Sequence, residues 1–249
     1  MTRRSLLATP IILIPARANS VSLAATPIAR LDTKWWRERH EAKLAELQRV
    51  MPDLIWLGDS ITQNFERNGP EPWAHYTPIW QQFYGAYRSV NLGFKGDATS
   101  HLLWRIIHGE LDDIAPRLAI VLIGANNLGR LHWSAADSVT GISTIVAEIN
   151  RRLPNTRVLL LGLLPSDRSA WASQTTVDIN TAMRALYSMG NKNHFLDATT
   201  LFMRGFALDL QLYYDPMLNP PEPALHPTAA GMAKLAARIA PLVTDLMKI

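Results

Sequence analysis

The residues best suited to do chemistry in this chain are a serine on a tight turn and a histidine far from it in the sequence. The serine lies in Gly58-Asp59-Ser60-Ile61-Thr62, directly after the apolar run Leu54 to Leu57. A strand would fix the position of Ser60, the glycine would permit the turn, and a helix starting there would aim backbone N–H groups at a reacting group. An ordinary loop in which Ser60 caps a helix fits the same residues. This segment alone leaves both interpretations open.

Three further segments carry polar groups where predicted elements meet. Gly93 to Thr99 follows the predicted strand Ser89 to Leu92, and Gly124-Ala125-Asn126-Asn127 follows the apolar run Leu118 to Ile123. His226-Pro227-Thr228 opens the last predicted helix. Ligands of open α/β sheets bind beyond the carboxyl ends of the strands. We therefore expect three strand ends and one loop to converge on one cleft.

The elements that would hold these groups follow from alternating apolar and helical patterns. Continuous apolar runs between helices are typical of strands covered on both faces, and hence of a parallel sheet. We predict an α/β fold: a three-layer α/β/α, flavodoxin-like domain over residues 26–249, with about five parallel strands. The expected strands are Leu54 to Leu57, Ser89 to Leu92, Leu118 to Ile123, Val158 to Leu163 and His194 to Leu196. The expected helices are Asp32 to Val50, Pro72 to Tyr84, Ser100 to His108, Ala135 to Arg152, Gln174 to Ser188 and Thr228 to Met247.

Composition limits the classes of function. The chain has 249 residues, 48% hydrophobic and 18% charged, with a formal net charge of +4. Its basic residues are scattered, so we expect no nucleic-acid partner. It has no cysteine, which excludes disulfides, a thiol nucleophile and cysteine-ligated zinc. We expect no metal and no organic cofactor.

The N-terminus has the three parts of a signal peptide. Thr2-Arg3-Arg4 is basic, Ser5 to Pro15 is mostly apolar, and Ala16-Arg17-Ala18 offers small residues for cleavage. Arg3 and Arg4 also resemble a twin-arginine signal, so the route of export stays open. We expect residues 1–25 to be a leader outside the fold, the mature protein to be periplasmic or secreted, and no stable membrane insertion after the leader is removed.

The four polar segments, in this order, resemble the SGNH (GDSL) hydrolase family. The likeness extends from Asp53 to Leu246, and it is greatest to the acetylhydrolase-like, carbohydrate esterase-type branch, in which a helix with Leu-Trp-Arg and a Gly-x-Asn-Asn segment recur. Here the helix reads Leu102-Leu103-Trp104-Arg105. Four ordered segments are far more specific than any one of them.

The resemblance implies a role for each polar group. Ser60 is the expected nucleophile and His226 the expected base, because a histidine is the usual proton acceptor near neutral pH. The backbone N–H groups of Ser60 and Gly96 and the side chain of Asn126 are the expected donors to an oxyanion. Gly96 and Asn126 could instead be ordinary turn residues.

Four polar residues flank these positions. They are Asp59, Asn91, Asp97 and Asn127. We expect them to hold the loops by hydrogen bonds, although a solvated turn explains Asp59, Asn91 and Asp97 equally well. Three tryptophans at loop ends could line a substrate cleft or pack in the core: Trp73, Trp133 and Trp171.

The carboxylate that should orient the histidine departs from the family pattern. The family has an aspartate three residues before the histidine, where this chain has Pro223. Glu222 is the carboxylate we favour, because it is adjacent and longer by one methylene. Asp215 is an alternative if the proline-rich loop folds back, and a backbone carbonyl holding the ring is another. Removing an orienting carboxylate can cost as much as ~10⁴ in turnover.

The sequence thus predicts an exported serine esterase that releases short acyl groups, most simply acetyl, from a small-molecule or polysaccharide ester. The polysaccharide would belong to the cell envelope or the extracellular space. The alternatives are a non-catalytic or weakly active polysaccharide-binding or assembly protein, an acyltransferase and a lipid esterase.

Overall fold

The centre of the molecule is a parallel sheet. The computed structural model describes residues 21–188 and 192–248. Its five strands lie side by side in the order β2-β1-β3-β4-β5, and all neighbouring pairs are parallel. They are β1 (Leu54–Gly58), β2 (Ser89–Gly93), β3 (Leu118–Leu122), β4 (Arg157–Leu161) and β5 (Asn193–Leu196). The predicted strands and the three-layer α/β/α architecture are confirmed.

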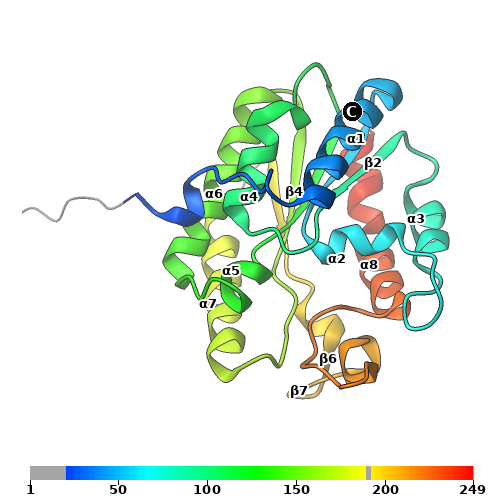
Figure 1. Ribbon diagram of the computed structural model, residues 1–249, viewed down its shortest axis with the longest axis vertical. Coiled ribbons are helices and arrows are strands. Elements are labelled where there is room, and N and C mark those ends of the chain that lie inside the picture. Colours follow the sequence, from blue (N-terminus) through cyan, green and yellow to red (C-terminus); the bar gives the residue numbers. More distant parts are fainter. Residues whose placement is uncertain (1–20, 189–191, 249) are drawn as a thin grey trace, which may run out of the picture.

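Helices cover both faces of this sheet (Figure 1). Helices α3 and α8 share one hydrophobic core with the sheet, and α1, α4, α6 and α7 share the other. The helices are α1 (Lys34–Val50), α2 (Ser60–Gln63), α3 (Tyr76–Tyr84), α4 (Thr99–Arg105), α5 (Ala125–Gly129), α6 (Ala135–Arg152), α7 (Ala170–Tyr187) and α8 (Ala229–Met247). No helix in the described ranges is long and apolar enough to cross a bilayer.

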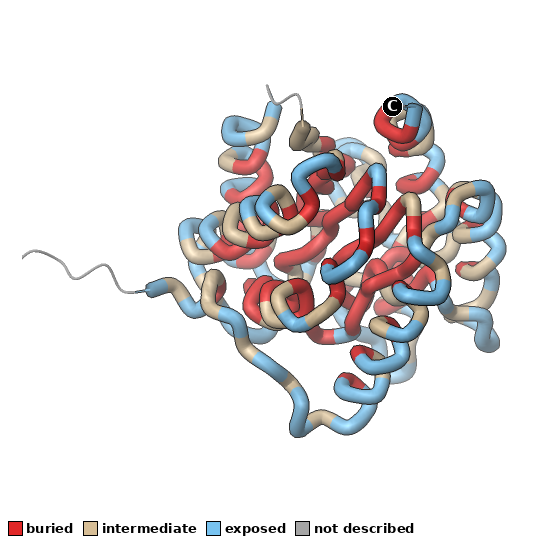
Figure 2. The backbone as a smooth tube through the Cα atoms, turned by 90° about the horizontal axis from the view of Figure 1, so that it is seen from above, coloured by how far each residue is buried: buried red, intermediate tan, exposed pale blue. Residues whose placement is uncertain are grey.

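The strand sequences explain why the sheet is buried on both faces. Successive side chains of a strand point to opposite faces. In β1, Leu54 and Trp56 enter the core under α3 and α8, while Ile55 and Leu57 enter the other core. All five residues of β1 and of β3 are buried, as Figure 2 shows for the centre of the molecule.

Three helix ends differ from the prediction by three or four residues, and helix α5 and one small sheet were not predicted. Helix α4 stops at Arg105 because His108 and Gly109, whose φ is +109°, leave the helical conformation. Helix α7 starts at Ala170, where the Ser169 side chain accepts a hydrogen bond from the Ala172 N–H at 3.1 Å. Helix α3 starts at Tyr76 rather than at Pro72.

The small sheet is a hairpin formed by β6 (Met203–Arg204) and β7 (Ala207–Leu208). It was not predicted, because strands of two residues are too short to show a period.

The chain enters the fold earlier than predicted. Ala24 is buried, its carbonyl accepts a hydrogen bond from the Thr99 hydroxyl at 2.8 Å, and Ser22 bonds Asp137 at 2.8 Å. Gly141 makes room for this contact, since a Cβ there would lie 2.5 Å from the Ala24 oxygen. The expectation that everything up to residue 25 lies outside the fold is therefore wrong for residues 21–25. The rest of the predicted leader, residues 1–20, lies outside the described residues.

The register brings the predicted functional loops to one edge of the sheet. Gly58, at the end of β1, is paired with Gly93 of β2 and with Leu122 of β3. The three strands thus end at the same level, and Ser60, Gly96 and Asn126 follow them on the same side.

Candidate active site

Ser60 is the first residue of α2, directly beyond β1. Its turn requires Gly58, because a Cβ there would lie 2.2 Å from the Thr62 hydroxyl and 2.5 Å from the Leu122 carbonyl. Asp59 caps the helix, accepting a hydrogen bond from the Ile61 N–H at 2.9 Å. The Ser60 hydroxyl is therefore not used for capping, which removes the structural explanation for a serine at this position.

Instead the Ser60 hydroxyl lies 3.0 Å from His226 Nε2, although 166 positions separate the two residues. The other ring nitrogen, Nδ1, lies 2.6 Å from Asp215 Oδ1. A carboxylate can only accept, so Nδ1 carries the proton and Nε2 accepts from the Ser60 hydroxyl. This chain of hydrogen bonds can remove the proton from the serine oxygen as that oxygen attacks a carbonyl carbon.

The carboxylate beside the ring is Asp215, and the prediction of Glu222 is wrong in this respect. Residues 212–215 run antiparallel beside residues 226–228, with a bridge between Tyr213 and Pro227. The Tyr214 N–H donates to the His226 carbonyl at 3.1 Å, which brings the neighbouring Asp215 level with the ring. Glu222 is exposed on the loop between these segments, and its side chain lines the cleft without contacting the ring nitrogens.

Asp215 is held as an anion. Burial alone would raise the pKa of its carboxyl, but hydrogen bonds from His226 and from the Leu225 N–H outweigh this effect and lower the pKa below its usual value. Tyr214 stacks on the His226 ring with centroids 5.3 Å apart and an angle of 8° between the planes. The ring is therefore fixed by a carboxylate at its edge and an aromatic ring on its face.

The Gly96 N–H is available to a ligand. Gly96 has a φ of +79°, a conformation that favours glycine, and its N–H forms no hydrogen bond with the described residues. A Cβ at this position would lie 2.7 Å from the Arg130 guanidinium. The Ser60 N–H, in the first turn of α2, has no intrahelical acceptor.

The Asn126 side chain lies between the two loops that carry Ser60 and Gly96. Its Nδ2 donates to the Asp97 carbonyl at 2.9 Å and lies 3.5 Å from Asp59 Oδ2. One of its two N–H groups is thus used within the protein, while the other makes only the longer contact.

The four flanking residues are buried and hydrogen-bonded. Asn91 joins β2 to α2 through the Thr62 carbonyl at 2.8 Å, and Asn127 joins α5 to α4 through the Thr99 hydroxyl at 2.9 Å. Burial raises the pKa of Asp59 to about 6, because its one short hydrogen bond, from the Ile61 N–H, stabilises the charged carboxylate less than the loss of water destabilises it.

Asp97 belongs to a buried ionic cluster centred on Arg105. Arg105 bonds Asp97 Oδ2 at 2.8 Å and the Gly58 carbonyl at 3.2 Å, and it also pairs with Glu110. Both side chains of the Arg105–Asp97 pair have no exposed surface. Arg105 therefore joins the end of β1 to the loop that carries Gly96. In the sequence, Arg105 stands out only as part of a recurring helix motif, and no local pattern indicates that it is buried.

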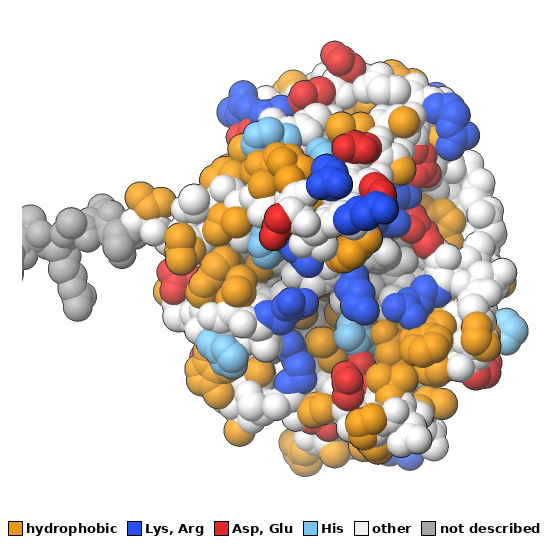
Figure 3. All heavy atoms as spheres, viewed as in Figure 1, with side chains coloured by type: hydrophobic (Ala, Val, Ile, Leu, Met, Phe, Trp, Pro, Cys, Tyr) orange, Lys and Arg blue, Asp and Glu red, His pale blue; other side chains and the backbone are white. Residues whose placement is uncertain are grey.

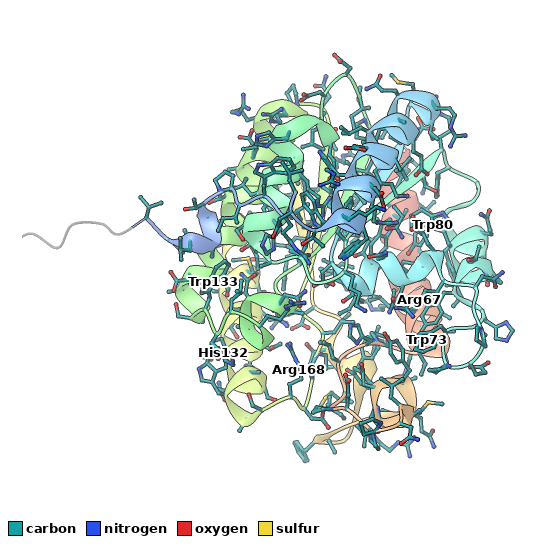
Figure 4. All side chains as sticks on the ribbon, viewed as in Figure 1. Arg67, Trp73, Trp80, His132, Trp133 and Arg168 are labelled. Atoms are coloured by element: carbon teal, nitrogen blue, oxygen red, sulfur yellow. The ribbon has the colours of Figure 1, made fainter. Side chains whose placement is uncertain are left out.

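A cleft of about 220 Å³ contains the Ser60 hydroxyl and the His226 ring. Its other lining residues are Arg67, Trp73, Lys95, Tyr214, Asp215, Leu218 and Glu222. Of the three tryptophans considered, Trp73 is part of this lining, and Figure 4 shows Trp133 on the opposite side of the face. Arg67, Lys95 and Tyr214 were not predicted, because they are widely spaced in the sequence. In the part of the chain that is described, no group of three or more His, Asp or Glu residues could hold a metal ion.

Comparisons with known proteins identify relatives of this chain in sequence and in fold. The chain is 33% identical over 170 residues to platelet-activating factor acetylhydrolase IB subunit alpha1 of Homo sapiens, and the alignment covers 68% of each protein. It is similar in fold to a GDSL-like lipase from Bacteroides thetaiotaomicron, with a TM-score of 0.65 and 17% identity over 84% of this chain and 97% of the other. A carbohydrate acetylesterase family member from Sinorhizobium meliloti gives a TM-score of 0.60 and 15% identity over 79% and 99%. The model of the GDSL-like lipase/acylhydrolase family matches residues 56–234, and the chain belongs to this family of acyl-ester hydrolases.

Proposed function

We propose that this protein is an exported serine esterase that removes short acyl groups, in particular acetyl, from an alcohol or sugar hydroxyl. The Ser60 oxygen attacks the ester carbonyl while His226 Nε2 takes its proton. The tetrahedral intermediate then expels the alcohol, which receives that proton from His226. Water, deprotonated by His226, attacks the acyl-serine and releases the carboxylic acid and free Ser60.

The observation that carries the proposal is the continuous hydrogen-bonded path from Ser60 through His226 to Asp215. The donors that we assign to the developing oxyanion are the Ser60 N–H, in the first turn of α2, and the Gly96 N–H, which forms no hydrogen bond with the described residues. The Asn126 amide is the third donor, through the N–H that is not bound to Asp97. Removal of one such donor typically costs ~3–4 kcal/mol of transition-state stabilisation.

Two observations support a short acyl group. The cleft of about 220 Å³ is small for a ligand site, since such sites usually range over roughly 300–1,000 Å³. Relatives and structural neighbours also carry the names acetylhydrolase and carbohydrate acetylesterase. A polysaccharide substrate in the envelope or outside the cell is the part of the proposal that follows from the export signal.

The decisive experiment compares the wild-type protein with Ser60→Ala. We expect hydrolysis of p-nitrophenyl acetate and acetylated xylan by the wild type, little hydrolysis of the octanoate ester, and loss of all activity in Ser60→Ala. Ser188→Ala, on the exposed end of α7, is the matched control. Equal rates for the wild type and Ser60→Ala would refute the assignment of the nucleophile. Release of free acetate, rather than transfer to an added sugar, distinguishes a hydrolase from an acyltransferase.

Pro223, in place of the family's aspartate, is the feature of the sequence that favours the non-catalytic binding alternative. Asp215 supplies a carboxylate to the His226 ring from another position, which removes that support.

Export is a separate part of the proposal, based on residues 2–18. We expect the full chain to be recovered outside the cytoplasm on cell fractionation. Replacement of both Arg3 and Arg4 by lysine should retain the protein in the cytoplasm if the signal is of the twin-arginine type and leave export unchanged if it is not. Recovery of the wild type in the cytoplasm alone would contradict export.

A further inference from the structure

Four positively charged side chains come from the loops at this edge of the sheet, and two of them, Arg67 and Lys95, line the cleft. Arg67 lies in the loop after α2, the helix that begins with Ser60, and Lys95 directly precedes Gly96 in the loop after β2. Arg130 follows α5, and Arg168 lies in the loop after β4. None of the four forms an ion pair with a carboxylate of the described residues. Figure 3 shows Lys and Arg side chains gathered around a histidine on this face.

Arg67 and Lys95 line the cleft directly. The Arg67 guanidinium lies over the Trp73 ring, 5.3 Å from its centroid, so that its position is defined by packing. The backbone of Lys95 is held by Gln63, whose Oε1 accepts the Lys95 N–H at 2.6 Å, while the side chain is exposed at the cleft.

Arg168 is held more rigidly, and Figure 4 shows it apart from Arg67 and Trp73 on the same face of the molecule. Its guanidinium donates to the Ala125 carbonyl at 3.0 Å and lies against Gly129, where a Cβ would be only 1.6 Å away. Burial lowers the pKa of Arg168, while Asp59 and Asp215 raise it. Partial burial of a cation that has no ion-pair partner is unfavourable in free energy. An anionic ligand close to the guanidinium would offset this desolvation penalty.

The position of His226 decides which part of a substrate meets these charges. The leaving alcohol receives its proton from Nε2, so the alcohol must lie on the histidine side of Ser60. The cleft that contains the His226 ring is also lined by Arg67 and Lys95. Glu222 is the one exposed carboxylate in its lining, because Asp215 is buried and bound to His226.

We propose that Arg67 and Lys95, supported by the charges of Arg130 and Arg168, form an anion subsite, and that the alcohol of the natural ester carries a carboxylate or phosphate. An acetylated acidic sugar has this chemistry. The proposal rests on the proposed esterase function and adds the substrate class to it.

The test uses three acetylated sugars that differ in one group: methyl O-acetyl-galactoside, the corresponding galacturonoside and the galactoside 6-phosphate. In the wild type at low salt we expect kcat/KM to be at least about tenfold higher for an anionic ester than for the neutral one. The ratio should fall toward one as salt is raised to about 0.5 M, because exposed charges are screened. The carboxylate and phosphate esters identify which anion is preferred.

Two variants assign the effect to the subsite. Arg67→Gln and Lys95→Gln should each reduce the ratio of anionic to neutral kcat/KM about fivefold, the effect of one charge at the edge of a site. Arg49→Gln is the control: it removes an exposed charge without an ion pair among the described residues, at the end of α1 beside the amino ends of the strands. It should leave the ratio unchanged.

Inhibition of the wild type provides a measurement that requires no variant. Galacturonate should inhibit hydrolysis of p-nitrophenyl acetate competitively and more strongly than galactose does. The anion subsite would be overturned, and the esterase left intact, by a ratio of anionic to neutral kcat/KM near one in the wild type. The same conclusion would follow if this ratio were unchanged in both Arg67→Gln and Lys95→Gln. Failure of the wild type to hydrolyse any of the esters would overturn the esterase, and the subsite with it.

Discussion

Replacement of Asp215 by asparagine should remove nearly all activity and leave the chain folded. The carboxylate accepts three hydrogen bonds, from His226 Nδ1 at 2.6 Å, from the His226 N–H at 2.5 Å and from the Leu225 N–H at 2.8 Å. The backbone donors share Oδ2, whereas the ring nitrogen contacts Oδ1. An asparagine that keeps its oxygen on the backbone donors must turn its NH₂ group toward the ring.

That orientation would reverse the protonation of the imidazole. An NH₂ group can only donate, so Nδ1 would become the acceptor and the proton would move to Nε2. A protonated Nε2 cannot take the proton of the Ser60 hydroxyl. A change of this kind in a serine triad costs ~10⁴ in turnover, and we expect kcat/KM for p-nitrophenyl acetate to fall by about that factor.

The same contacts predict the effect on stability. The pKa of Asp215 is lower in the folded chain than its ordinary value of 3.8, so its charge stabilises the fold above that pH. This stabilisation is lost as the pH falls through the lowered pKa. The difference in the free energy of unfolding between wild type and Asp215→Asn should therefore be largest near neutral pH and should shrink below about pH 4.

Glu222→Gln is the matched control, because it removes a carboxylate from the same loop and the same cleft without touching the ring. Its kcat/KM for the neutral ester should stay well within tenfold of the wild type, and thermal unfolding of both variants would show that they are folded. The reasoning is refuted if Glu222→Gln loses as much activity as is expected of Asp215→Asn while Asp215→Asn retains most of its activity.

Three further predictions concern residues around Ser60. Gly96→Ala should lower kcat by about 10²-fold in an ester assay, because alanine disfavours a φ of +79° and its Cβ would displace the Arg130 guanidinium; unchanged kcat would exclude the Gly96 N–H as a donor. Arg105→Leu should destabilise the chain by about 3–5 kcal/mol in urea unfolding, because it removes the buried guanidinium that pairs with the carboxylates of both Asp97 and Glu110; a loss under 1 kcal/mol would contradict this. Asp59 has a pKa of about 6 in the fold, so wild-type stability should fall as the pH rises from about 4 to 6, and Asp59→Asn should abolish this fall. Parallel thermal-unfolding curves for wild type and Asp59→Asn at every pH would show that Asp59 does not titrate in this range.

Much of the fold was predictable because its strands are continuous apolar runs. All five residues of β3 are buried, and such a run can only be a strand or helix segment in a core. The helix ends were less certain, since they depend on single residues. His108, which the prediction placed inside the helix after Gly96, has a φ of −117° and a ψ of 48° and is not helical.

The residues of the site also differ in how well the sequence predicted them. Ser60 and His226 could be chosen because each lies at a recognisable junction between elements. The prediction of Glu222 failed because proximity in sequence was taken for proximity in space. The antiparallel bridge between Tyr213 and Pro227 brings Asp215 to the ring from a distance of eleven positions. The position of Asp215 beside the ring depends on the hydrogen bonds between residues 212–215 and residues 226–228, which the sequence does not show.

By itself, then, the sequence determined the parallel sheet, the edge at which its loops gather and the pair of residues that could exchange a proton. The physical reason is that apolar periodicity and glycine turns act over a few neighbouring residues. The tertiary structure alone decided that Asp215 completes the path from Ser60, that Arg105 is buried between two loops, and that Arg67 and Lys95, which have no ion pair among the described residues, line one cleft. Those features depend on contacts between segments far apart in the chain, and no local pattern encodes such distances.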